Sequence, residues 1–357
     1  MNSDMFKSIK NAKARDLYMN MWEHNCIVND ACIKRTTIRK CGDDDSTRES
    51  HCSYSFKGED KLETLINVFC IPRENKDLFR QKFAMACGCS GNGHEYMKMT
   101  TLHSSTLLAL LFFYNVTEEN KLTIDGIGTF YKSVFKFVSP VIDKGHNTCV
   151  DVVLIGENDI GEEILLFLES KFSEYYMCAA KRSCKISERY LFRRCSEALY
   201  NEEFLETLGI VRCNAKDGFF TINSKEVFYI DGIKQMIAHY VGIRNDIDPS
   251  IGYIDQKETA QDEVIELIKD GAKVILAEML FDPVVGDFEI DDGKTYKDAY
   301  AEKYSLLAAG MNAELEKAKL QDKFCVCPNV LYYSMFLKDD IGYKLDNKVR
   351  AFYFGEC

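Results

Sequence analysis

The chain has 357 residues, 46% of them apolar, and its formal net charge is −11. The apolar content excludes a disordered protein, and the length suits one large domain or two smaller ones. A wholly acidic protein does not suggest nucleic-acid binding, although a local basic face would be enough for it.

Cysteine usage and the lengths of the apolar segments indicate a compartment. Residues 1–16 lack the apolar core of a secretory signal, and the longest apolar run, Leu107 to Tyr114, is too short to span a bilayer. The 15 cysteines are odd in number, and pairs such as Cys325 and Cys327 lack the CxxC spacing of zinc sites. We therefore expect reduced, buried thiols in a cytoplasmic protein that has no membrane partner.

Residues 1–90 are predicted to form an extension that packs on the core of the fold. Apolar positions indicate a helix over residues 4–25 and short helices from Leu62 to Cys70 and from Asp77 to Ala86. Residues 41–60 are polar and typical of a loop. The segment from Cys87 to Gly93 is rich in glycine, but its spacing is not that of a phosphate-binding Walker loop.

The rest of the chain alternates between helical and strand-like patterns. Residues 103–105 can cap a helix through residues 107–112, and Thr129 to Val138 alternates like a strand. Further helices are expected at Lys181 to Tyr200, Ile230 to Gly242 and Tyr296 to Leu320, with strands at Ala272 to Leu280 and Phe324 to Leu337. This order predicts an α/β fold, a mixed sheet with helices on both faces.

The segment from residue 147 to residue 176 predicts two strands joined by a polar turn. Asp151 lies on the first strand and Glu169-Ser170-Lys171 ends the second, where alternation puts Glu169 and Lys171 on one face. The run from Ile164 to Leu168 before them is apolar throughout, as in a central strand. Charges at the end of such a strand are expected to be paired or used. Two acids beside a lysine suit a divalent metal and metal-assisted phosphodiester cleavage.

Asp151 and Glu169-Ser170-Lys171 together resemble the motif of the PD-(D/E)XK nuclease superfamily, which has the restriction-endonuclease-like fold. The core of that fold is a helix, three strands with the acid on the second and E-x-K on the third, a helix and a fourth strand. Phe167 to Tyr175 is particularly similar to uncharacterised bacterial restriction-endonuclease-like proteins, and residues 93–95 and 104–105 fit the same group. Val150 stands where many members have proline. The resemblance implies a nuclease domain over residues 91–357, with its catalytic core over roughly residues 91–282.

The resemblance also implies roles for the site residues. Asp151, Glu169 and the Ser170 carbonyl would hold Mg²⁺ (or Mn²⁺), with Glu95 reaching the metal from the first core helix. Lys171 would orient the attacking water and stabilise negative charge as the phosphorane forms. The alternative is structural: a Glu–Lys salt bridge at a strand end, a nearby solvated Asp151 and a solvated loop acid at Glu95.

Basic residues after the second strand are candidates for DNA contacts. On a helix, Lys181, Lys185, Arg189 and Arg193 would form one stripe, which Arg182 and Arg194 widen. An ordinary solvated face is the alternative.

Some superfamily members, the RecB-like nucleases, carry a glutamine and a tyrosine on a helix after E-x-K. Here Gln235, His239 and Tyr240 lie on the predicted helix with one extra residue in the spacing. Gln235 would then touch DNA or water near the metal, and a polar pair in a packed helix is the alternative.

The expected function is therefore Mg²⁺-dependent hydrolysis of DNA phosphodiester bonds, in restriction or in defence against foreign DNA. The partner would be nucleic acid, and a homodimer stays open. The alternative is a catalytically silent protein of the same fold that binds nucleic acid or a protein partner. A nucleotide-processing enzyme is a third reading, but it lacks a phosphate loop.

Overall fold

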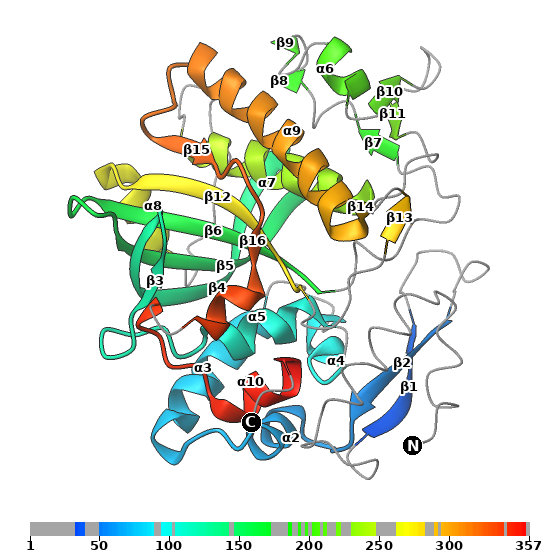
Figure 1. Cartoon of the computed structure of the whole chain (residues 1–357), viewed down its shortest axis with the longest axis vertical. Helices are drawn as coiled ribbons and strands as arrows, with labels where there is room; N and C mark the ends of the chain where they lie inside the picture. The colour runs from blue at the N-terminus through cyan, green and yellow to red at the C-terminus, as the bar shows by residue number, and fades with distance from the viewer. Residues whose placement is uncertain are drawn as a thin grey trace.

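The structure is a computed structural model that describes residues 33–39, 50–88, 94–101, 104–142, 146–172, 185–187, 192–193, 197–198, 202–207, 210–212, 219–222, 230–247, 262–282, 289–291, 294–338 and 341–354. A curled mixed sheet has helices on both of its faces (Figure 1). The predicted α/β class is confirmed.

A seven-stranded sheet with the order β15-β12-β6-β5-β4-β3 forms the centre, and β16 also pairs with β12. Strands β3 to β6 are antiparallel to one another, whereas β12 is parallel to β6, β15 and β16. β6 is the central strand because its residues 164–171 are buried on both faces. The strands are β3 Leu122–Ile124, β4 Gly128–Ile142, β5 His146–Glu157, β6 Glu163–Lys171, β12 Lys273–Leu280, β15 Phe324–Val326 and β16 Leu331–Tyr332.

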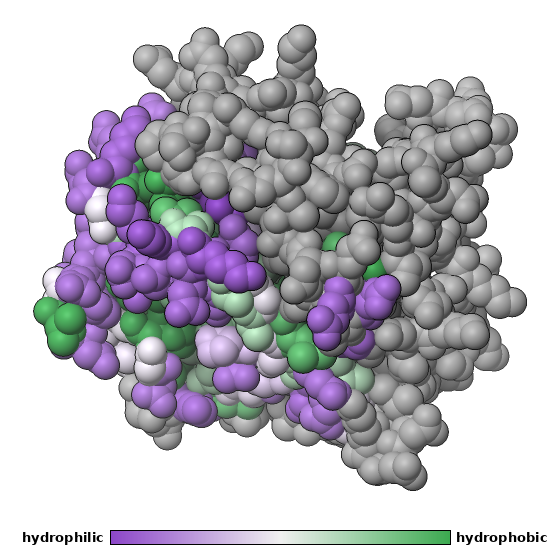
Figure 2. All heavy atoms as spheres, turned by 90° about the horizontal axis from the view of Figure 1, so that it is seen from above, coloured by the Kyte–Doolittle hydropathy of each residue, from purple (hydrophilic) through white to green (hydrophobic). Residues whose placement is uncertain are grey.

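Two groups of helices cover the sheet. Figure 1 shows α7 (Ile230–Ile247) and α9 (Tyr296–Lys317) above it, and α3 (Lys76–Cys87), α5 (Ser105–Phe113) and α10 (Asn347–Phe354) below it. The described surface on the upper side is largely hydrophilic (Figure 2), as expected of a face that meets water. None of the described helices has the length and apolar content needed to cross a bilayer.

Helix α5 is apolar all round because protein surrounds it. It begins at Ser104, whose hydroxyl accepts the Leu107 N–H at 3.1 Å and caps the helix. The sheet lies on one side of it, and Phe112 contacts the rings of Tyr333 and Tyr353 on the other. This burial fixes the first turn of α5 next to the end of β6, where the Ser170 hydroxyl donates to the Ser105 carbonyl at 3.1 Å.

The N-terminal helices share the core of the sheet. The predicted helices are confirmed as α2 (Lys61–Val68) and α3, and Phe79 of α3 packs edge-to-face on Tyr114 after α5. Phe56 packs against Phe352 of α10, so residues near both ends of the described chain meet in one cluster.

Three sequence-based expectations are corrected. The predicted helix at residues 181–200 is wrong, since its described parts are strands β7, β8 and β9. The loop expected at residues 41–60 contains β2, which pairs with β1. The single strand expected from Phe324 to Leu337 is two short strands and a 3-10 helix, because Pro328 and the residues around it interrupt the ladder. The helix expected over residues 4–25 lies outside the described residues.

The remaining elements are short or lie away from the central sheet. They are β1 Ile33–Arg39, β2 Ser50–Phe56, η4 Arg73–Asn75, α4 His94–Lys98, β7 Lys185–Ser187, β8 Phe192–Arg193, β9 Glu197–Ala198, α6 Glu202–Thr207, β10 Ile210–Arg212, β11 Phe219–Ile222, α8 Asp262–Asp270, β13 Glu289–Asp291, β14 Lys294–Thr295 and η8 Tyr333–Leu337.

Candidate active site

Glu169 and Lys171 form a buried ion pair at the end of β6. Lys171 Nζ donates to Glu169 Oε1 at 2.7 Å, and the two side chains are only 3% and 5% exposed. Burial alone would raise the pKa of the Glu169 carboxyl, but Lys171 and the contact with His239 outweigh it and hold that pKa below its usual range. The pair therefore stays charged inside the fold.

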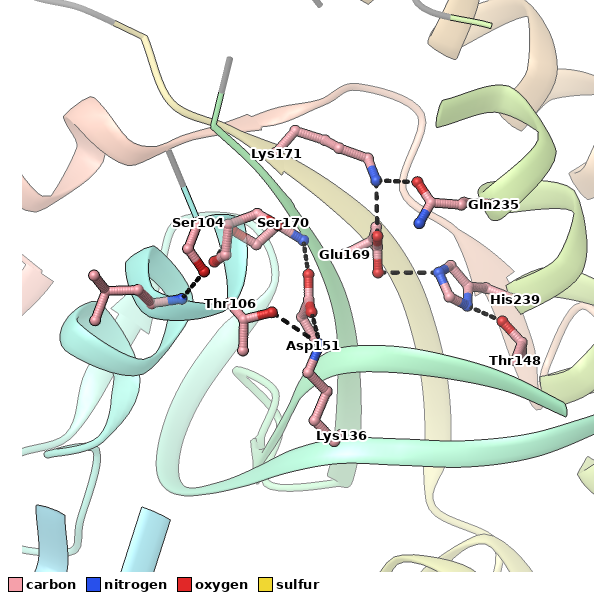
Figure 3. A network of polar contacts seen from close by, with 12 residues as sticks. Ser104, Thr106, Lys136, Thr148, Asp151, Glu169, Ser170, Lys171, Gln235 and His239 are labelled. Atoms are coloured by element: carbon pink, nitrogen blue, oxygen red, sulfur yellow. Dashed lines mark hydrogen bonds and ion pairs between the residues drawn. The ribbon is translucent and has the colours of Figure 1, made fainter. Parts of the chain in front are cut away.

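Helix α7 supplies two side chains to this pair (Figure 3). Gln235 Oε1 accepts a hydrogen bond from Lys171, and one turn later His239 Nε2 lies 3.0 Å from Glu169 Oε2. That second contact lacks hydrogen-bond geometry, so both atoms are buried without a hydrogen bond. Gln235 is exposed, which puts the buried Lys171 one side chain away from solvent.

His239 is held from the sheet side as well. Its Nδ1 lies 2.5 Å from the hydroxyl of Thr148 on β5. The approach depends on Gly242 of α7, because a Cβ there would lie 2.8 Å from Ser139 Cβ and from Thr148 Cγ2. The missing side chain lets α7 pack close enough for His239 to reach both Thr148 and Glu169.

Asp151 lies on β5, the antiparallel neighbour of β6, and both of its oxygens have donors. Oδ1 accepts from Lys136 Nζ at 2.6 Å, and Oδ2 accepts from the Ser170 N–H at 3.0 Å. Lys136 also donates to Thr106 in the first turn of α5 at 3.0 Å. Burial and the charge of Glu169 raise the pKa of Asp151, and Lys136 opposes them.

The two acids therefore have separate partners on the two sides of β6. Asp151 is bonded to Lys136, which also donates to Thr106 of α5. Glu169 instead points to His239 of α7 (Figure 3). The two acids still interact, since the charge of Glu169 raises the pKa of Asp151.

Lys136 reaches Asp151 through an unusual backbone conformation. It has φ of 57° in the middle of β4, between the pairs Phe135–Val152 and Phe137–Val150 of the β4–β5 ladder. A lysine in the left-handed region costs free energy that the surrounding structure must offset, and such positions cluster at functional sites. The conformation places a cation directly on Asp151.

The carboxylates of Asp151 and Glu169 supply some of the oxygen ligands that a hard cation requires. In the described part of the chain, no three His, Cys, Asp or Glu side chains converge as a metal cage. Mg²⁺ needs less, because it keeps several waters and is usually held by one or two carboxylates. Glu169 Oε2 is a buried acceptor without a hydrogen bond, as an oxygen kept for a cation would be. At Asp151 a cation would compete with Lys136.

A third buried acid lies beside Glu169. Glu278 of β12 is its register partner in the parallel ladder, and it accepts a hydrogen bond from Tyr300 of α9 at 2.7 Å. Neighbouring residues of parallel strands point to the same face of the sheet, so Glu278 adds negative charge to the α7 and α9 side.

The other predicted site residues divide into four groups. Ser170 lies in the site, where its hydroxyl contacts Tyr333 and the Ser105 carbonyl. Glu95 belongs to α4, but its side chain is outside the described residues, as are Lys181, Arg182, Arg189 and Arg194. Lys185 and Arg193 lie on strands β7 and β8, so the four-residue helical stripe does not form there. Tyr240 is buried and bonds to Glu314.

Sequence reasoning missed Lys136, Thr106, Thr148 and Glu278. Two of them left a signal, because Lys136 and Glu278 are charges inside otherwise apolar runs, Val134 to Val138 and Val274 to Leu280. Such charges are expected only where they are paired. The two threonines give no comparable signal, since threonine is common in strands and at helix starts.

The chain matches no protein-family model, no curated protein and no solved structure with which it was compared. Its own geometry is therefore the basis for a functional proposal.

Proposed function

We propose that this chain is a Mg²⁺-dependent nuclease that hydrolyses DNA phosphodiester bonds. The observation that carries the proposal is the buried Glu169–Lys171 ion pair at the end of β6, beside Asp151 on the paired strand. Buried charges that are held together at a strand end and lie close to solvent mark candidate catalytic sites. The element order supports the same proposal: α5, β4, β5, β6, α7 and a parallel β12 occur in the order of a restriction-endonuclease-like core, with β3, α8 and the short elements from β7 to β11 inserted between them.

Each side chain has a role in this proposal. Asp151, Glu169 and the Ser170 carbonyl would hold Mg²⁺, which when bound supplies charge stabilisation and acidifies a coordinated water. Lys171 donates toward the scissile phosphate and stabilises the negative charge that develops there. His239 and Thr148 keep Glu169 in one orientation, and a site held this way loses little free energy to reorganisation.

Substrate would approach over the N-terminal half of α7. Gln235 is exposed and contacts Lys171 directly, so a phosphate that displaces the Gln235 amide meets the ammonium. Behind Gln235, Lys171 contacts Glu169, which in turn contacts His239, and a restriction or defence role would use these groups on foreign DNA.

The proposal is tested by assaying purified protein on supercoiled, linear and single-stranded DNA and on RNA, with Mg²⁺, Mn²⁺ or EDTA. Cleavage of a DNA substrate should require the divalent ion and should disappear in Glu169→Gln. The matched control is Glu263→Gln, which removes an exposed acid paired with Lys132 at 2.6 Å. Equal cleavage by wild type and Glu169→Gln would identify a contaminating nuclease and reject the proposal.

A second candidate is a catalytically silent protein of the same architecture that binds nucleic acid or a protein partner. The observation that favours it is charge pairing: Asp151 and Glu169 each have a buried lysine, Lys136 and Lys171, so neither carboxylate needs a metal for its charge to be balanced. DNA binding without cleavage under all of these conditions would favour this candidate.

A further inference from the structure

Lys136 gives the candidate metal site its own cation. Its ammonium lies 2.6 Å from Asp151 Oδ1, and the two side chains are 8% and 6% exposed. The Ser170 N–H occupies the other oxygen. With both donors in place, each Asp151 oxygen already accepts one hydrogen bond, and Oδ1 lies directly against a cation.

We propose that Lys136 is a built-in competitor for the divalent cation at Asp151. The ammonium neutralises the carboxylate when no divalent ion is bound, and it must leave Oδ1 before Asp151 can act as a ligand. This inference rests on the proposed function, because it concerns how the same site is loaded. It makes metal binding weaker than the two carboxylates alone would allow.

Competition follows from the burial of the pair. A buried carboxylate without a partner is strongly destabilising, so the protein without metal needs Lys136 at this place. Two cations cannot both lie against one oxygen in a medium of low dielectric constant without repelling each other. Lysine suits an exchangeable partner, because its compact charge is carried on a flexible four-carbon chain.

Thr106 is a second hydrogen-bond partner of the Lys136 ammonium, beside Asp151. Its hydroxyl accepts from Lys136 Nζ at 3.0 Å, and the first turn of α5 positions it. Removing this acceptor should loosen Lys136 without changing any candidate metal ligand. Thr106 therefore offers a second, milder change that tests the same competition.

The test is titration of metal-free protein with Mn²⁺, followed by calorimetry and by the paramagnetic resonance signal of free Mn²⁺. We expect Lys136→Met to bind Mn²⁺ with a Kd lower by about tenfold, equal to about 1.4 kcal/mol. The control is Lys132→Met, which removes an exposed lysine from the same strand and changes the net charge equally. Its Kd should stay within about twofold of the wild-type Kd.

Thermal unfolding gives a second readout. In EDTA, Lys136→Met should melt below the wild type because Asp151 has lost its buried partner, and saturating Mn²⁺ should raise its Tm more than that of the wild type. If Lys136→Met does not fold, Thr106→Val should still bind Mn²⁺ more tightly than the wild type. Wild-type affinity in both variants would overturn this inference and leave the nuclease proposal standing. Absence of Mn²⁺ binding in every variant would overturn both.

Discussion

Glu169 and Lys171, two residues apart on β6, are joined at 2.7 Å inside the protein, while Gln235 links the same lysine to the surface. A buried ion pair contributes little net stability compared with an apolar pair, because desolvation costs about as much as the attraction gains. Stability alone therefore does not account for this pair at the buried end of a central strand, whereas the proposed function does.

The first prediction concerns the stability of this pair as pH changes. The folded-state pKa of Glu169 lies below its ordinary value, so its stabilising contribution is present above about pH 4 and is lost only as the pH falls through the lowered pKa. Lys171→Met should reduce the free energy of unfolding by about 3–5 kcal/mol at pH 7.

The loss of unfolding free energy in Lys171→Met, relative to the wild type, should become smaller as the pH falls toward about 4. The reason is that the unpaired Glu169 takes up a proton in the folded variant. Urea denaturation of wild type and variant between pH 4 and pH 8 measures this difference. A deficit that stays constant over that range would mean that Glu169 does not depend on Lys171.

Lys82 on α3 gives the second prediction. It is buried and donates to the Ser133 carbonyl of β4, and burial lowers its pKa to about 8. The unfolded chain holds its proton more tightly, so the stability cost of Lys82 is complete below about pH 8 and disappears as the pH rises toward about 10.

Lys82→Met should accordingly be more stable than the wild type at pH 7, by about 1–3 kcal/mol, and the advantage should fall between pH 8 and pH 10. Denaturant unfolding of the two proteins across this range provides the comparison, with Lys317→Met, which removes an exposed lysine of α9, as control. If Lys82→Met is more stable than the wild type by the same amount at every pH, the lowered pKa of Lys82 is contradicted.

The third prediction tests how His239 is held. Thr148→Val keeps the side-chain shape but removes the hydroxyl 2.5 Å from His239 Nδ1, which leaves a buried ring nitrogen unsatisfied. The expected loss is about 1–3 kcal/mol of unfolding free energy, together with weaker Mn²⁺ binding as Glu169 loses its orientation.

The control for Thr148→Val is Thr123→Val, which breaks a threonine pair between β3 and β4. It should change stability by only about 0.5 kcal/mol and leave Mn²⁺ affinity unaltered. Equal effects of the two substitutions would show that Thr148 has no special relation to the site.

A fourth prediction concerns DNA binding by the basic residues after β6. If Lys185 and Arg193 contact phosphates, Lys185→Ala/Arg193→Ala should weaken binding and reduce the log–log salt slope by about two units. Fluorescence anisotropy in EDTA at several salt concentrations measures both. The charge-matched control is Lys317→Ala/Lys319→Ala at the exposed end of α9. Equal salt slopes for the two double variants would mean that Lys185 and Arg193 do not contact the phosphates of DNA.

Local patterns in the sequence predicted the parts of the fold where burial and periodicity agree. The apolar run of β6 and the alternation of β4 identified central strands, and Glu169 and Lys171 were placed on one face because alternate strand residues share a face. Gln235 and His239 were also recognised as sharing a helical face, which the contacts of α7 confirm.

Long-range pairing explains the failures. Residues 185–187 form a strand because Lys185 to Ser187 pair with Phe219 to Thr221, a partner that the four-residue spacing of basic side chains cannot reveal. The position of Lys136 on Asp151 depends on a left-handed backbone in the middle of β4, which no propensity predicts for lysine. Pro328 argues against one continuous strand from Phe324 to Leu337, because proline cannot donate a hydrogen bond to a strand ladder.

The most direct test of the nuclease proposal compares Lys171→Ala with Lys132→Ala in one DNA cleavage assay with Mg²⁺ or Mn²⁺. Lys171 is buried against Glu169, whereas Lys132 is an exposed lysine of β4 paired with Glu263. The proposal predicts that Lys171→Ala loses cleavage by about 100-fold or more while still binding Mn²⁺, and that Lys132→Ala cleaves like the wild type. Cleavage by Lys171→Ala at the wild-type rate would contradict the account.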